Sequence, residues 1–303
     1  MAEQFVRVSD EIELCYETFG DPADPTALMI MGLATQMIAW PDEMCEQLAG
    51  RGFHVVRFDN RDAGRSTHVK GRPPKLRELL LRSKKPARYR LSDMADDAAG
   101  LLRELDLAPA HVIGASMGGM IAQTVAARHP GVVLSLTSIM SNTGSLLTGR
   151  PGFAVYPLFL ERPRGGREAA IERTMKVFEL IGSRGLARDD ELIRDLAERS
   201  YDRDHDAAAP GRQLAAIIAS GNRRKEIRRI KAPTLVIHGD EDRMVGKSGG
   251  RATARAIPGA KLMLIKGMGH DLPRAAWPQI IDGIVANAAR AGDRLEAERQ
   301  QAA

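Results

Sequence analysis

Short apolar runs rich in β-branched residues recur along the chain and alternate with segments whose apolar residues repeat every three or four positions. The short runs have the length and composition of buried strands, whereas the three- and four-residue spacing is typical of amphipathic helices. The predicted strands are the eight runs at 5–9, 12–19, 27–31, 54–58, 111–115, 132–140, 234–239 and 261–265. Helical patterns stand out at 41–50, 91–106, 118–130 and 275–289.

This alternation predicts an α/β fold with a mainly parallel, eight-stranded sheet and helices on both faces, since parallel strands need crossover connections. The first two runs are joined only by a tight turn near Ser9 and Asp10. A connection that short cannot cross over the sheet, so we expect these two strands to form an antiparallel hairpin at its edge.

One long segment, residues 141–230, breaks the alternation because it contains helical patterns and turns but no convincing strand. An insertion after a strand end would lie over the carboxyl edge of the sheet, where ligands bind in open α/β folds. We therefore predict a core domain made of residues 1–140 and 231–291, with residues 141–230 as a helical cap. Residues 292–303 are predicted to be a flexible tail.

A candidate nucleophile lies where a predicted strand runs into a predicted helix, in the stretch HVIGASMGG. Here Gly114, Ser116 and Gly118 form the pattern G-x-S-x-G, whose glycines permit a sharp, strained turn that exposes the serine hydroxyl. A second match, GKSGG at 246–250, is not preceded directly by a strand. We therefore interpret Ser248 as a helix N-cap and Ser116 as the nucleophile.

A serine hydroxyl needs a base to take its proton and a carboxylate to orient that base. His270 follows the last predicted strand in a glycine-containing loop, a position that would carry its imidazole over the carboxyl edge of the sheet. For the acid, the loop after the strand at 234–239 offers Asp240, Glu241 and Asp242. We favour Asp242, although spacing separates it only weakly from the other two carboxylates.

The order Ser116, Asp242, His270 on alternating strands and helices resembles the α/β-hydrolase superfamily over nearly the whole chain. In that family the acid commonly stands in the pattern H-G-x-x-D, which residues 238–242 match. The histidine commonly follows a glycine before the last helix, as in the pair at 269–270. The resemblance implies a Ser-His-Asp triad.

Two loops extend this resemblance. The stretch FDNRDAGRST resembles the family's D-x-R-G-x-G-x-S loop, and we expect its Asp59 and Arg61 to brace the loop rather than contact substrate. The stretch MGLATQ at 31–36 stands where the family usually has H-G-x-P. This variant loop and the phrase FGDPADPTALMIMGL look similar to aclacinomycin methylesterase-like hydrolases.

Acyl transfer also requires backbone N–H groups that stabilise the negative charge on the carbonyl oxygen. One donor should be the N–H of Met117, directly after the nucleophile. By resemblance to the family, the second donor is the N–H of Leu33. The missing histidine and proline leave the donor available, because it belongs to the backbone, but they change the shape of the loop.

These features together predict a serine hydrolase that cleaves a small or medium carboxylic ester or lactone, with no metal or organic cofactor. The apolar stretch at 150–160 is expected to line the acyl or alcohol pocket. A cofactor-free haloperoxidase or perhydrolase, or a carbon–carbon bond hydrolase, would use the same triad. A catalytically silent binding module on the same fold is the non-enzymatic alternative.

Composition and charge bear on the partners and the cellular compartment of the protein. The 303 residues carry a formal net charge of +5, and ten basic residues against one acidic residue fall within 65–90. We favour a solvated basic segment there over contact with a membrane surface, and we expect no nucleic-acid partner because no recognisable binding fold accompanies the charge. Cys15 and Cys45 are predicted to be buried thiols, which together with the lack of a signal pattern favours the cytoplasm. No feature indicates an oligomeric state.

Overall fold

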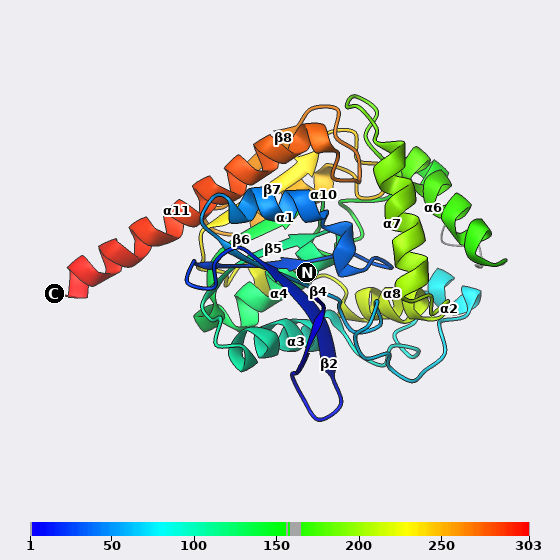
Figure 1. The fold of residues 1–303 in the computed structure, drawn as a ribbon, viewed down its shortest axis with the longest axis horizontal. Helices are drawn as coiled ribbons and strands as arrows, with labels where there is room; N and C mark the ends of the chain where they lie inside the picture. The colour runs from blue at the N-terminus through cyan, green and yellow to red at the C-terminus, as the bar shows by residue number, and fades with distance from the viewer. Residues whose placement is uncertain (1, 156, 158–164, 303) are drawn as a thin grey trace.

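The computed structural model describes residues 2–155, 157 and 165–302, and in this part of the chain eight strands form one sheet (Figure 1). The strands are β1 (Gln4–Arg7), β2 (Glu13–Phe19), β3 (Thr26–Ile30), β4 (His54–Phe58), β5 (Ala110–Ala115), β6 (Val133–Ile139), β7 (Thr234–Gly239) and β8 (Lys261–Ile265). Their order across the sheet is β1-β2-β4-β3-β5-β6-β7-β8. The β1–β2 and β2–β4 pairs are antiparallel and the remaining pairs are parallel, which confirms the predicted sheet and its edge hairpin.

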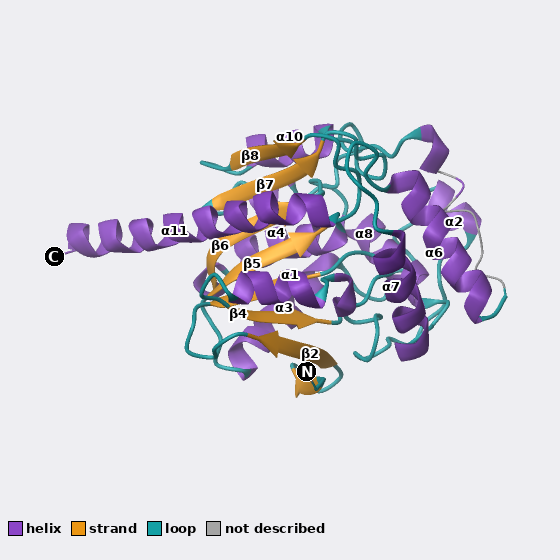
Figure 2. Ribbon diagram, turned by 45° about the horizontal axis from the view of Figure 1, so that its top comes forward, coloured by secondary structure: helices purple, strands orange, loops and turns teal. Residues whose placement is uncertain are grey.

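Helices cover both faces of the sheet (Figure 2). The described α-helices are α1 (Asp42–Ala49), α2 (Leu76–Leu80), α3 (Leu91–Glu104), α4 (Met117–Arg128), α6 (Arg167–Ile181), α7 (Asp190–Arg203), α8 (Ala209–Ser220), α9 (Arg224–Ile227), α10 (Ser248–Ala256) and α11 (Trp277–Ala302). Short 3-10 turns occur at Met37–Ala39, Pro130–Val132, Phe153–Val155 and Arg274–Ala276. None of the helices among the described residues combines the length and the apolar character needed to cross a membrane.

The strands build two cores because successive side chains point to opposite faces of the sheet. Leu28 and Ile30 of β3 pack in one cluster with α3 and α4. Ala27 and Met29 of the same strand pack in the other cluster with α1 and α11. All four side chains are fully buried, as expected for a parallel strand covered on both faces.

The segment between β6 and β7 lies beyond the carboxyl ends of the parallel strands, where α6, α7 and α8 gather (Figure 2). Its described residues contain helices and turns but no strand, in line with the pattern that predicted an insertion. That this segment forms a separate cap domain stays a prediction. Part of the stretch at 150–160 that was expected to line a pocket, namely Tyr156 and residues 158–160, lies outside the described residues.

The end of the chain was predicted to be a flexible tail, and this stays a prediction. Residues from Gly292 continue α11 as a helix to Ala302, which projects from the body of the molecule (Figure 1). The stretch DRLEAERQQA is rich in good helix formers, and one interior glycine costs only about 1 kcal/mol relative to alanine. A glycine in this context therefore does not end the helix.

The prediction for Ser248 is wrong, because Lys247 occupies the N-cap position of α10 and Ser248 is the first helical residue. The Ser248 hydroxyl instead accepts the backbone N–H of Gly149 at 2.9 Å. The Ser248 hydroxyl thus bonds to a distant loop, whereas the local pattern predicted a bond to the first turn of its own helix.

Cys15 and Cys45 are buried as predicted, and burial raises the pKa of both thiols to about 12.

Candidate active site

Ser116 connects β5 to α4 through a sharp turn. Its backbone has φ 54° and ψ −117°, a conformation that non-glycine residues rarely adopt and that is often retained at functional sites. The turn is tight because backbones approach closely: a Cβ on Gly114 would lie 2.2 Å from the carbonyl oxygen of Gly118. A Cβ on Gly118 would lie 2.0 Å from the carbonyl oxygen of Ile30 on β3. Glycine is therefore required at both positions.

The structure brings the three predicted catalytic residues into one hydrogen-bonded chain. Nε2 of His270 lies 2.9 Å from Oγ of Ser116, and Nδ1 of His270 lies 2.8 Å from Oδ2 of Asp242. With the ring proton on Nδ1, the imidazole donates to the carboxylate and accepts from the serine hydroxyl. These three side chains come from loops at the carboxyl ends of β5, β7 and β8.

Neighbouring groups hold the loop that carries His270. Its backbone N–H donates to the carbonyl oxygen of Ile181 at 2.8 Å, and the N–H of Gly269 donates to Oγ of Ser183 at 2.8 Å. The Ser183 hydroxyl in turn donates to Asp271. The last residue of α6 and the residues that follow this helix thus hold the loop that carries the imidazole.

Asp242 is the carboxylate that reaches the imidazole. Its side chain is inaccessible to solvent, and its Oδ1 accepts the N–H groups of Met244 at 2.9 Å and Val245 at 2.8 Å. Burial alone would raise its pKa, but the charge of His270 and hydrogen bonds from His238 and His270 outweigh burial and lower the pKa to about 2. Asp242 is therefore an anion at neutral pH.

The two other carboxylates of this loop have different positions. Oδ1 of Asp240 accepts the N–H of Gly267 at 2.7 Å, so this side chain ties the loop after β7 to the loop after β8. Glu241 is exposed to solvent, and its own N–H donates to the carbonyl oxygen of Met268. The structure thus distinguishes three carboxylates that their spacing in the sequence could not distinguish.

The two predicted oxyanion donors belong to residues near the nucleophile. Met117 begins α4, whose positive N-terminal end favours negative charge. The loop that carries Leu33 passes next to Ser116, since a Cβ on Gly32 would lie 3.2 Å from Cβ of Ser116. In the described part of the chain neither the N–H of Leu33 nor that of Met117 has an intramolecular acceptor. Both are thus available to a ligand.

Asp59 and Arg61, which we expect to brace their loop, both make polar contacts within the protein. Asp59 is fully buried and accepts the N–H groups of Met37 at 2.7 Å and Arg65 at 3.0 Å, while Nη2 of Arg203 lies 2.9 Å from its Oδ2. Arg61 forms a two-pronged ion pair with Asp97 at 2.5 and 2.6 Å. These contacts leave both side chains engaged within the protein.

Sequence reasoning gave no role to four buried residues around the site. Nε2 of His238 lies 2.8 Å from the carbonyl oxygen of Val245 and 3.4 Å from Oδ2 of Asp242. The others are Asn60, Gln36 and Gln213, which hold the loop at 31–36. The pattern H-G-x-x-D could have singled out His238, but no motif marks the other three.

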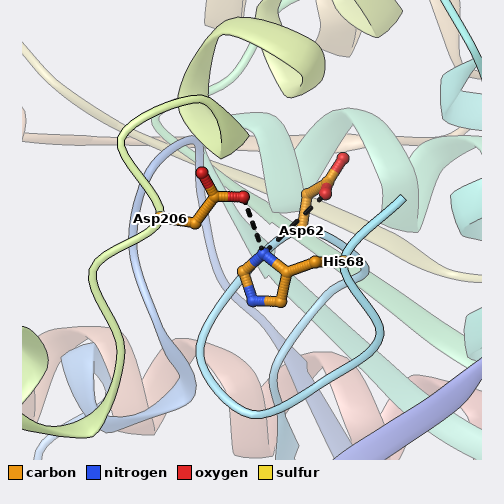
Figure 3. A group of neighbouring side chains, drawn as sticks. All are labelled: Asp62, His68 and Asp206. Atoms are coloured by element: carbon orange, nitrogen blue, oxygen red, sulfur yellow. Dashed lines mark hydrogen bonds and ion pairs between the residues drawn. The ribbon is translucent and has the colours of Figure 1, made fainter. Parts of the chain in front are cut away.

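A second cluster has the spacing of a metal site, because ligand atoms of Asp62, His68 and Asp206 all lie within 4.8 Å of one another (Figure 3). Arg212 already supplies a cation there: its Nη2 lies 2.6 Å from Oδ1 of Asp62 and 2.6 Å from Oδ2 of Asp206. The hydroxyl of Tyr89 also donates to Asp62 at 2.6 Å. We therefore assign this cluster as an ion-pair network.

Comparison with known proteins identifies the family to which this fold belongs. The family model described as alpha/beta hydrolase fold matches residues 25–273, so the chain belongs to this family. The chain is 29% identical over 299 residues to rhodomycin D methylesterase DauP of Streptomyces sp. strain C5, covering 92% of this chain and 95% of that relative. It is 28% identical over 300 residues to rhodomycin D methylesterase DnrP of Streptomyces peucetius, covering 92% and 96%.

Among solved structures, the enol-lactonase from Burkholderia xenovorans LB400 has a TM-score of 0.68 with 21% identity, covering 95% of this chain and 99% of that chain. At this identity the likeness concerns the fold.

Proposed function

We propose that this protein is a serine hydrolase that cleaves a small or medium carboxylic ester or lactone through an acyl-enzyme on Ser116. The observation that carries the proposal is the hydrogen-bonded chain from Ser116 through His270 to Asp242, with distances of 2.9 and 2.8 Å. Because the relatives DauP and DnrP are methylesterases, we infer that the methyl ester of a carboxylic acid is the first substrate to test.

In the first half of the reaction, Oγ of Ser116 attacks the ester carbonyl while Nε2 of His270 takes its proton. Asp242 stabilises the imidazolium and keeps it oriented, since its low pKa maintains the negative charge. The N–H groups of Leu33 and Met117 hold the oxyanion, and loss of one such donor costs roughly 100- to 1000-fold in kcat in other serine hydrolases. The imidazolium then protonates the leaving alcohol.

The second half releases the acid. Water replaces the alcohol, gives a proton to Nε2 of His270 and attacks the acyl carbonyl, after which the proton returns to Oγ of Ser116 as the acid departs. In a lactone the leaving alcohol remains part of the acyl group, so this step releases a single hydroxy acid. No metal or organic cofactor enters the scheme.

The setting of this activity is also a proposal. We infer a small-molecule partner and a reducing, cytoplasmic environment, which the two free and buried thiols of Cys15 and Cys45 support. Within the basic segment at 65–90, Arg72 is already paired with Glu78 by two contacts of 2.7 Å. This pairing supports a solvated segment rather than a docking surface for nucleic acid or a membrane.

The proposal is tested by reaction with a fluorophosphonate probe, which phosphonylates an activated serine. We expect the native protein to be labelled and Ser116→Ala to be unlabelled. Native protein that resists labelling would overturn the proposed enzyme, and a labelled Ser116→Ala protein would overturn the choice of nucleophile.

The same preparation, supplied with methyl esters, a lactone series and a peroxide-dependent halogenation assay, distinguishes the hydrolase from a cofactor-free haloperoxidase. We expect release of methanol or opening of a lactone without peroxide. Halogenation in the absence of ester or lactone hydrolysis would replace our assignment with the peroxidase.

A further inference from the structure

The loop that carries Leu33 lacks the histidine and proline that usually shape it in the family, so other residues must fix its backbone. Ala34 has φ 59°, in the left-handed region that is unfavourable for a non-glycine residue. Its N–H donates to Oε1 of Gln213 at 3.0 Å. A strained peptide next to an oxyanion donor is thus held by a side chain from α8.

Gln213 is well suited to fix this peptide. It is completely buried, and its Nε2 donates to the carbonyl oxygen of Arg61 at 3.0 Å. Both ends of the amide are therefore engaged, which determines its orientation: the oxygen faces Ala34 and the nitrogen faces Arg61. The side chain joins the loop at 32–36 to the loop that follows β4.

The helix that carries Gln213 is itself anchored. The neighbouring Arg212 pairs with Asp62 and Asp206 at 2.6 Å each. On the other side of the loop, Nε2 of Gln36 donates to the carbonyl oxygens of Ser200 at 2.7 Å and Asp204 at 3.1 Å. The loop is thus bonded at two points to the segment between β6 and β7.

From this geometry we propose that Gln213 is a positioning residue for the oxyanion hole: it fixes the backbone at Ala34 so that the preceding N–H, that of Leu33, faces the carbonyl oxygen of the bound ester. The inference rests on the proposed function, since it assumes acyl transfer at Ser116. It assigns to the segment over the sheet a part in the chemical step, because α8 supplies a contact that the oxyanion loop would otherwise lack.

The test replaces Gln213 with leucine, which keeps most of the volume but neither hydrogen bond. A displaced donor weakens binding of the tetrahedral oxyanion more than binding of the ground-state ester. We expect Gln213→Leu to lower kcat for a methyl ester by about 10- to 100-fold with little change in KM. Affinity for a trifluoromethyl ketone inhibitor should fall by a similar factor, while affinity for the carboxylic acid product should stay the same.

Gln123→Leu is the matched control. Gln123 on α4 is also completely buried, and its Nε2 donates to Oγ of Ser138 at 2.9 Å. Its replacement by leucine therefore removes a buried, hydrogen-bonded amide, as Gln213→Leu does. We expect it to lower the melting temperature without changing the ratio of ketone to product affinity. If both variants change that ratio equally, or if Gln213→Leu leaves kcat and ketone affinity unchanged, Gln213 is not a positioning residue.

Should the leucine variant fail to fold, Gln213→Glu decides the matter. Its carboxylate can still accept from Ala34, but it can donate to the carbonyl of Arg61 only when protonated. The ratio of its kcat to that of the native protein should therefore rise as the pH falls, and a constant ratio overturns the inference. Native protein that neither reacts with the fluorophosphonate nor cleaves an ester would instead overturn the proposed function itself.

Discussion

Asp242 concentrates several interactions on one carboxylate, each of which favours the anion. Two backbone N–H groups occupy Oδ1, while His270 and His238 both approach Oδ2, at 2.8 and 3.4 Å. Removing the negative charge of Asp242 would leave the shape of the site nearly intact and would change only the electrostatic interaction with the imidazole of His270. A substitution here therefore tests the charge of the carboxylate without displacing the base.

Replacement of Asp242 by asparagine is accordingly expected to lower kcat for ester hydrolysis by about 10⁴-fold, the loss seen when the triad acid is amidated in a serine protease, because the imidazole can adopt the wrong tautomer. Asp240→Asn is the control, since Asp240 bonds to the N–H of Gly267 and does not reach His270. Steady-state kinetics on one methyl ester measures both. A larger loss in Asp240→Asn than in Asp242→Asn would transfer the acid role to Asp240.

The residues around the triad show what a sequence can and cannot predict. Ser116 directly follows β5, and Asp242 and His270 lie in the loops after β7 and β8, so local pattern and strand order were enough to predict them as candidates. Gln213 is 179 positions from its partner Ala34, and its role follows only from how α8 packs against the loop. Ser248 shows the same limit, because a distant backbone N–H uses the hydroxyl that local rules assigned to its own helix.

At the scale of elements, the ion-pair network connects the loop after β4 to the start of α8. The ring of His68 lies among Asp62, Asp204 and Asp206, with its Nδ1 3.1 Å from Asp206 and its Nε2 3.3 Å from Asp204. The network also contains Arg212, whose charge balances part of this acidic group. The charge state of one histidine therefore affects the contact between the two elements.

Partial burial alone would lower the pKa of His68, but its bond to the carbonyl oxygen of Gly64 and the charges of Asp204 and Asp206 outweigh burial and raise the pKa. A raised pKa means that the folded state binds the proton more tightly than the unfolded state, whose histidine has a pKa of about 6.5. The stabilising contribution is thus complete below about pH 6.5 and is lost as the pH rises through the folded-state pKa.

His68→Gln should therefore lower the free energy of unfolding most at acidic pH, and the difference from the native protein should shrink as the pH rises. Urea unfolding at a series of pH values measures this difference. In an Asp206→Asn background the same substitution should have a smaller effect, because one of the facing charges is gone. A difference that grows with pH would contradict the assigned direction of the pKa shift.

At the scale of the whole molecule, the periodicity of apolar residues predicted the sheet and its covering helices because burial on two faces imposes a strong pattern. Leu28 and Met29, adjacent in β3, belong to different cores, as a strand covered on both faces requires. The end of α11 lacks such a constraint. Its backbone projects beyond the sheet (Figure 1), so composition rather than packing determines whether it is helical. The periodicity of apolar residues therefore could not predict that the helix continues to this point.

The projecting part of α11 also leads to a prediction about stability. Within the body, Ile284 is buried and Nδ2 of Asn287 donates to the carbonyl oxygen of Leu136 at 2.9 Å, whereas Gly292 and Asp293 are exposed. A protein ending at Leu295 should therefore keep the melting temperature and esterase activity of the full chain.

A protein ending at Ala286 lacks Asn287 and the buried turn that follows, and it should melt at a clearly lower temperature because the Asn287 amide no longer donates to the carbonyl of Leu136 and buried apolar contacts are lost. Thermal unfolding of the two truncated proteins beside the full chain measures the contrast. If the truncation at Leu295 destabilises the protein as much as that at Ala286, the projecting turns of α11 contribute to the fold, and the boundary between core and tail lies further along the chain than residue 291.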